Sequence, residues 1–281
     1  MCRNLALAAT ALSLALAAPA FAKDKSKDAA PAQAAAQAPA KPADAAPTPP
    51  RKATAQERAE ADRLDPLARA AFWAREVDVD SRDVQAGVRL AAALRGIGRN
   101  EDASLTVQKV LVIAPADHDA LLELARDYLA GGQGFYAIAP LKTLQTQDAR
   151  DWRIPSLLGV AYEQVSRDAD AETAWRQALV LSPDNPAVLS NLAMHFAAKG
   201  DAAQAEALLR KAVARPDSGV KVRQNLALVL GLQGRFAEAE QLTREDLPPE
   251  IAEANMAYLR AAAGGEVRSW KALQGAQSAV N

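Results

Sequence analysis

The sequence predicts an all-α protein in which antiparallel helix pairs stack one after another into a superhelical solenoid. Three observations support this fold class. Side-chain types recur at a spacing of 34 residues, as in Leu192 and Leu226, and glycine recurs at one position of that period. The chain is 50% hydrophobic but only 5% aromatic, with alanine supplying much of the apolar content. Alanine favours helices, and scarce aromatic residues argue against one bulky core.

The apolar positions of the period indicate two helices per unit. One position always holds leucine, namely Leu90, Leu124, Leu158, Leu192 and Leu226. A small residue follows each leucine, and a larger apolar residue lies four positions after it, namely Leu94, Tyr128, Tyr162, Phe196 and Leu230. Large residues beside small ones are expected where helix backbones approach closely. The units therefore begin at Val84, His118, Trp152, Pro186 and Val220.

A turn separates the two helices of each unit. The turn position holds Gly98, Gly132, Ser166, Gly200 and Gly234, and alanine follows five residues later at Ala103, Ala137, Ala171, Ala205 and Ala239. In the last unit a second glycine, Gly231, also interrupts the apolar stripe, so both glycines there are interpreted as part of the turn. Pro140 inside the second unit's second helix predicts a kinked or short helix.

The third unit carries the clearest family resemblance. It reads Leu158-Gly159-x-x-Tyr162, then Ala171-x-x-x-Trp175, then Pro183. This pattern resembles the tetratricopeptide repeat, which implies a solenoid whose concave groove binds an extended segment or a helix of another protein. Five such repeats are expected over residues 84–249.

The two ends of the chain are expected to differ from the repeats. Residues 1–22 resemble a cleavable signal peptide, with Arg3, an apolar run and Ala20-Phe21-Ala22, and residues 23–52 form an Ala/Pro-rich linker expected to be disordered. Residues 53–83 are interpreted as a degenerate helix pair broken at Asp65-Pro66, with Phe72 and Trp73 packing on the first repeat. Residues 250–281 are interpreted as a capping helix and tail, after a frayed second helix in the fifth repeat.

The sequence does not indicate catalysis. His118 is interpreted as a residue at a helix start and His195 as a packing residue, and the glycines of residues 131–134 are explained by a turn. The net charge of -1 gives no electrostatic reason to expect nucleic acid as a partner, and after the leader we find no stretch able to span a membrane. We expect no catalytic residue, no cofactor and no metal, although an enzyme or a subunit of one is the more distant alternative.

The family resemblance also suggests binding residues. In peptide-binding tetratricopeptide proteins, the groove often has an asparagine just before the patterned leucine, a position held here by Asn191 and Asn225 and, in an earlier repeat, by Arg89. An amide can both donate to and accept from a peptide backbone. Further groove candidates are Lys221, Gln224, Arg153 and Arg126. The alternative is that these side chains are merely solvated or bond within their own helices.

A second resemblance concerns the C-terminal region. The Arg-Gln-Asn-Leu-Ala-Leu segment from Arg223, the Asp-Leu-Pro-Pro-Glu break at residues 246–250 and the helix after it resemble the tetratricopeptide protein of the Tad (tight adherence) system, which assembles Flp pili. This implies a periplasmic adaptor that binds a secretin or another pilus-assembly component. Members of that family are often lipoproteins, whereas Cys2, the sole cysteine, precedes the apolar run of the leader. A general periplasmic scaffold for cell-envelope assembly remains the alternative.

Overall fold

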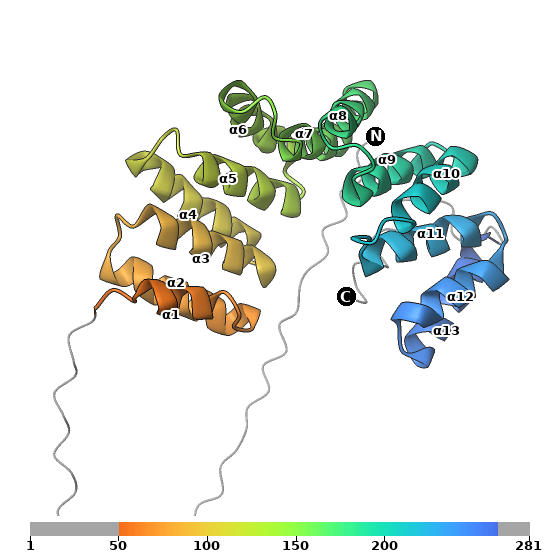
Figure 1. Ribbon diagram of the computed structural model, residues 1–281, viewed down its shortest axis with the longest axis horizontal. Coiled ribbons are helices and arrows are strands. Elements are labelled where there is room, and N and C mark those ends of the chain that lie inside the picture. The colour runs from red at the N-terminus through yellow and green to blue at the C-terminus, as the bar shows by residue number, and fades with distance from the viewer. Residues whose placement is uncertain (1–50, 264–281) are drawn as a thin grey trace, which may run out of the picture. The chain divides into compact units, whose positions relative to one another are not determined.

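The computed structural model describes residues 51–263, so the expected leader, most of the linker and the tail after residue 263 lie outside the described residues. All regular secondary structure within this range is helical, in agreement with the predicted class (Figure 1). The helices are α1 (Ala55–Ala61), α2 (Pro66–Val79), α3 (Val84–Gly96), α4 (Asn100–Ile113), α5 (His118–Ala130), α6 (Gly134–Gln147), α7 (Arg153–Gln164), α8 (Asp168–Leu181), α9 (Pro186–Ala198), α10 (Ala202–Val213), α11 (Val220–Leu232), α12 (Phe236–Asp246) and α13 (Pro249–Ala263).

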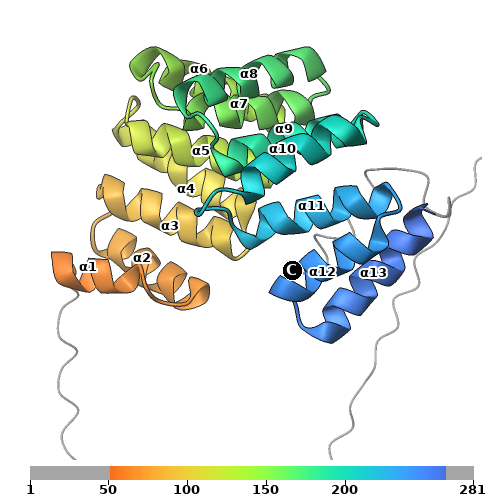
Figure 2. The ribbon, with the colours of Figure 1, turned by 45° about the vertical axis from the view of Figure 1, so that its right-hand side comes forward.

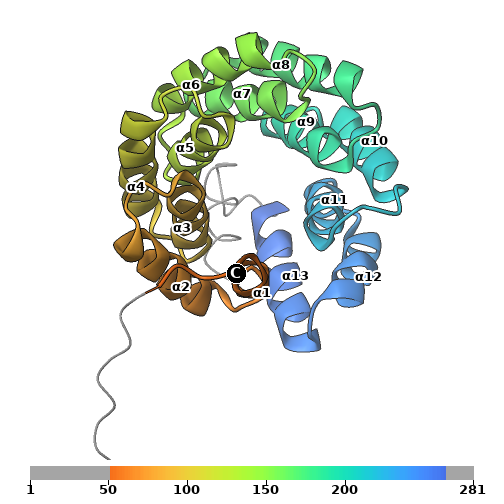
Figure 3. The ribbon, with the colours of Figure 1, turned by 60° about the vertical axis from the view of Figure 1, so that its left-hand side comes forward.

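Consecutive helices pack in pairs, and successive pairs follow one another along an arc (Figures 1 and 2). The first helices of the five repeats, α3, α5, α7, α9 and α11, line the inner side of the arc, and their partners from α4 to α12 lie outside (Figure 3). The repeat period therefore decides which helix faces the concave side. None of the helices from α1 to α13 has both the length and the apolar character that crossing a membrane requires.

The turn position has the same backbone conformation in all five repeats. Gly98, Gly132, Gly200 and Gly234 have φ between +71° and +87°, and Ser166 has φ of +59°. In each repeat the amide after this residue donates to the carbonyl five residues back, as in Arg99 to Leu94 at 2.9 Å. This Schellman motif satisfies carbonyls that the end of a helix leaves without partners. The glycine column is thus explained by the left-handed conformation of the turn.

The recurring apolar residues form the core between the helices. All five alanines of the second helices are 0% exposed, and the patterned leucines are at most 9% exposed. A Cβ on Gly159 would lie 2.4 Å from Trp175 Nε1, and this indole nitrogen donates to the Ser156 carbonyl at 3.1 Å. In the third repeat, the absence of a side chain at Gly159 therefore leaves the space that the Trp175 ring fills.

Pro140 does not shorten its helix. Helix α6 has 14 residues, the same length as α4 and α8, so the expectation of a short helix is wrong. Proline removes the hydrogen bond to the Tyr136 carbonyl. The helix nevertheless continues to Gln147, so the loss of this one hydrogen bond does not end it.

The N-terminal helices close the start of the solenoid. Asp65 caps α2 and Pro66 is its first residue. The break at Asp65-Pro66 therefore separates α1 from α2. Trp73 is 1% exposed, and Arg58 lies over its ring while pairing with the fully buried Glu76 at 2.7 Å. At the end of the predicted linker, Lys52 pairs with Asp80 and Asp83 of this region.

The C-terminal helices cover the last repeat. Helix α12 has 11 residues, and Thr243 remains buried by donating its hydroxyl to the Ala239 carbonyl at 2.7 Å. Helix α13 packs on α11 and α12, and a Cβ on Gly231 would lie 2.8 Å from Leu259. Gly231 is therefore a helical residue that admits Leu259, in contrast to its predicted place in the turn.

Candidate functional site: a groove on the inner helices

A groove of about 590 Å³ crosses the inner face of the first repeats. It is lined by residues of α3, of α5 and of the turn before α5, together with the first residue of α7, namely Val84, Gln85, Val88, Arg89, Ala92, Arg95, Asp117, Asp119, Leu122, Glu123, Arg126 and Arg153. Its wall combines apolar side chains with guanidinium groups. Because these residues come from successive inner helices, the stacking of the repeats creates the groove.

Three of the predicted binding residues meet in this groove. Arg89 and Arg153 are exposed and Arg126 is half-buried. Arg89 lies 3.4 Å from the exposed Asp62, and Arg126 lies 3.5 Å from Glu123. The Arg89–Asp62 pair is solvent-exposed and contributes little to stability, so an incoming carboxylate can replace Asp62. The hydrogen bond from Arg153 to Asp151 raises the pKa of Arg153.

The other four predicted residues lie on α9 and α11 and do not line this groove. Asn225 is 7% exposed, and its Nδ2 donates to Ser190 Oγ at 2.9 Å. Its amide thus joins neighbouring repeats instead of facing a partner, in contrast to the expected groove role. Asn191 and Gln224 are half-buried, and Lys221 is exposed.

Beneath the groove lies a buried charge cluster, formed by Arg95, Glu123 and Asp127. Arg95 reaches from α3 to Glu123 Oε1 at 2.7 Å and to Asp127 Oδ1 at 3.2 Å. The carboxylates of Glu123 and Asp127 are 4% and 0% exposed, and within residues 51–263 neither oxygen of Asp127 accepts a hydrogen bond. Burial, reinforced by the charge of Glu123, raises the pKa of Asp127 to about 8. This cluster fixes Arg95 at the floor of the groove.

A related pair occurs two repeats later. His195 is 2% exposed, packs against Trp175 and Phe196, and holds its Nδ1 3.2 Å from Glu163 Oε1. Its packing role agrees with the sequence interpretation. Burial raises the pKa of Glu163, with the interaction with His195 acting in the opposite direction.

The two pairs occupy the same repeat positions, since Glu163 and His195 follow Arg95 and Asp127 by 68 residues. The remaining repeats have Leu129, Ala197 and Gly231 at the first position and Ala93, Ala161 and Val229 at the second. At both repeat positions the other repeats have apolar residues or glycine. A charged residue or a histidine at such a position is the signal by which both pairs could have been found.

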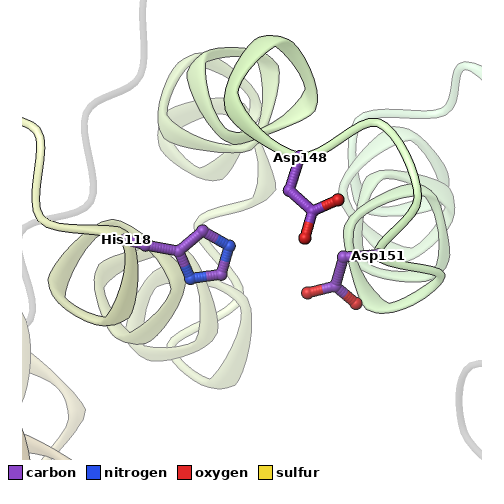
Figure 4. Close-up of side chains that lie close together, drawn as sticks. All are labelled: His118, Asp148 and Asp151. Carbon is purple, nitrogen blue, oxygen red and sulfur yellow. The ribbon is translucent and has the colours of Figure 1, made fainter.

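A third polar group lies beside Arg153. His118, the first residue of α5, points toward Asp148 and Asp151, which come from the end of α6 and the following turn (Figure 4). Each of the three can offer one metal-ligating atom, and these atoms lie within 4.8 Å of one another. His118 begins its helix as expected, with Asp117 as the capping residue.

Several solved structures of helical-repeat proteins are similar to this chain. A tetratricopeptide-repeat protein from Thermus thermophilus is 25% identical over 63% of this chain and 98% of its own, with a TM-score of 0.57. One from Parabacteroides merdae is 12% identical over 73% and 79%, with a TM-score of 0.61. MamA from Desulfovibrio magneticus is 20% identical over 56% and 90%, with a TM-score of 0.50. No protein-family model and no curated protein matches the chain.

These likenesses agree with the helix pairs, the glycine turns and the alanine column described above. A solenoid of this kind presents an extended concave surface, which makes it a scaffold for protein–protein interaction. Residues 51–263 therefore have the fold of a tetratricopeptide-repeat protein.

Proposed function

We propose that this protein is a non-catalytic periplasmic adaptor that binds a segment of a partner protein in the groove of α3, α5 and α7. The observation that carries the proposal is the meeting of Arg89, Arg126 and Arg153 around an apolar strip formed by the partly exposed Val84, Val88 and Ala92. Guanidinium groups bind carboxylates in a bidentate manner, and apolar strips bind the hydrophobic side of a helix. The partner segment is thus one that carries acidic and apolar side chains together.

The partner that we propose is the secretin, or another component, of a Tad-type Flp-pilus apparatus. This part of the proposal rests on the resemblance of the segment from Arg223 to Leu228, and of the Asp-Leu-Pro-Pro-Glu break, to the Tad tetratricopeptide protein. The signal-peptide-like residues 1–22 support export to the periplasm.

A cellular experiment tests this role. The gene is deleted and then complemented with the natural sequence, or with a variant in which Arg89, Arg126 and Arg153 are all alanine. Secretin multimers and surface Flp pili are measured by immunoblotting and electron microscopy. We expect both to be lost in the deletion, restored by the natural gene and strongly reduced with the variant at equal protein level.

The rival function is that of a general scaffold for cell-envelope assembly. It predicts normal secretin multimers in the deletion strain together with an envelope defect such as sensitivity to detergent. The neighbouring genes distinguish the two functions further, because a pilin, a secretin and a secretion ATPase beside this gene favour the pilus role. Normal pili in the deletion strain would refute the pilus role and leave the groove to another partner.

A further inference from the structure

The group of His118, Asp148 and Asp151 has the composition of a metal site (Figure 4). One imidazole and two carboxylates are ligands that zinc and other divalent transition metals accept. Atoms bound to one such ion at about 2.1 Å lie at most about 4.2 Å apart. The three ligand atoms lie within 4.8 Å of one another, so small side-chain rotations bring them to one ion.

Local hydrogen bonds hold the two carboxylates in place. Asp148 Oδ1 accepts from the Arg150 amide at 3.0 Å, and Asp151 Oδ1 accepts from the Arg153 amide at 2.9 Å. The side chain of Asp151 is only 6% exposed. Such partners orient a carboxylate before a ligand arrives, which reduces the entropy lost on binding.

The imidazole of His118 has a free nitrogen on the side of this group. Its Nε2 is buried and has no hydrogen-bond partner among residues 51–263. Its Nδ1 lies 3.7 Å from Asp119 Oδ1, which is too long for a hydrogen bond. A buried polar atom without a partner calls for an explanation, and a bound ion is one of the recognised explanations.

The stacking of the repeats does not require these side chains. At the preceding boundary, the positions of His118, Asp148 and Asp151 are held by Val84, Ala114 and Asp117, and at the following boundary by Trp152, Ser182 and Asn185. Both boundaries form with the same helix pairing. The combination of one histidine and two aspartates is therefore specific to this boundary.

We propose that His118, Asp148 and Asp151 bind a divalent transition-metal ion of the zinc type, with solvent completing its coordination. Arg153 competes with the ion, because its Nη2 lies 2.6 Å from Asp151 Oδ2 and its Nε 2.9 Å from Oδ1. A cation at this position repels the guanidinium, so metal binding releases Arg153 from Asp151 toward the groove that it lines.

Isothermal titration of the tag-free full chain with ZnCl₂ at pH 7 tests the proposal. The chain carries Cys2→Ser, since a thiolate would itself bind zinc. We expect one ion per chain, with affinity reduced at least about tenfold in His118→Asn and in Asp148→Asn. Asp170→Asn, an exposed acid on α8, serves as the matched control and is expected to leave affinity unchanged.

Arg153→Met is expected to change zinc affinity in the opposite direction. It removes the competitor of the ion, so we expect tighter zinc binding than in the parent chain. Circular dichroism of each variant checks that the helices are intact. The absence of zinc binding by the parent chain would overturn the proposal. Equal zinc affinity of Asp148→Asn and the parent chain would also overturn it, because the histidine alone would then attract the ion. Neither outcome depends on the identity of the protein partner.

Discussion

The indole ring of Trp175 occupies the space where a side chain on Gly159 would lie. A Cβ at Gly159 would come within 2.4 Å of Nε1 of this ring, and Trp175 is 0% exposed. The glycine belongs to the first helix of the third repeat and the tryptophan to the second. This contact explains why the third repeat combines a glycine after its patterned leucine with a tryptophan in its second helix.

Gly159→Ala is expected to destabilise the protein by about 1–3 kcal/mol, because the added methyl group overpacks a well-filled core. Urea unfolding followed by circular dichroism measures the change. Gly96→Ala is the matched control, since Gly96 is helical and a Cβ there meets no atom of residues 51–263 within 4 Å. The control should stabilise by up to about 1 kcal/mol through helix propensity. Equal effects of the two substitutions would contradict the packing described.

Substitutions at the turn position of two repeats are expected to change the melting temperature in opposite directions. Ser166 has φ of +59°, a conformation that costs about 1 kcal/mol for a residue with a side chain. Ser166→Gly is therefore expected to raise the melting temperature. Gly200→Ala is expected to lower the melting temperature, because Gly200 has φ of +87°, where a side chain strains the backbone. A Cβ at Gly200 meets no atom of the described helices within 4 Å, so this backbone strain is the expected cost. Thermal unfolding of both variants checks the signs.

Asp127 predicts a specific dependence of stability on pH. Its pKa is about 8 in the folded protein and about 3.9 in an unfolded chain. Between these values the folded protein holds one proton more, so this group's contribution to stability is full below pH 4 and is lost as pH rises through 8. The slope is up to about 1.4 kcal/mol per pH unit.

Asp127→Asn removes this titration. We expect the free energy of unfolding of the variant, minus that of the natural protein, to increase as pH rises from 5 to 8. Urea unfolding at several pH values measures the difference. A difference that is constant with pH would show that Asp127 is already ionised at the bottom of this range, with Arg95 as its counter-ion.

Asn225 is expected to act on stability more than on binding. Asn225→Ala leaves Ser190 without its amide partner and should destabilise by about 1–3 kcal/mol. Asn191→Ala, at the equivalent position of the preceding repeat, is the comparison and should have a smaller effect, because Asn191 is only half-buried. A normal unfolding midpoint for Asn225→Ala, together with weaker partner binding, would restore the groove role first expected of it.

Features that repeat with the period could be predicted from the sequence. Gly200 and its equivalents follow from the left-handed turn, and Ala171 and its equivalents follow from close helix packing. The role of Gly231 could not be predicted, since Leu259 approaches it from a helix outside the repeats. The expectation of a short helix at Pro140 was wrong, because a helix can lose one backbone hydrogen bond without ending there.

The arginines of the candidate groove could be predicted because their positions also follow from the repeat period. Arg89, Arg126 and Arg153 meet because each lies on the first helix of a successive repeat, and these helices share the inner side. The charge cluster around Asp127 forms because Arg95 and Asp127 each occur at a position that is apolar in most repeats. A search for recurring residues does not detect such single exceptions. His118 and Asp148 are far apart in the sequence, and only the fold brings them together.

The inner groove, and not the outer face, is proposed as the surface that binds the partner protein. The most direct test is the affinity of the purified secretin for the natural chain and for two triple-alanine variants, one at Arg89, Arg126 and Arg153 and one at Lys142, Arg176 and Arg244 on outer helices. Both remove three positive charges. We predict at least about tenfold weaker binding, or ~1.4 kcal/mol, for the groove variant alone. Equal weakening by both variants, or weakening by the outer variant alone, would contradict the account.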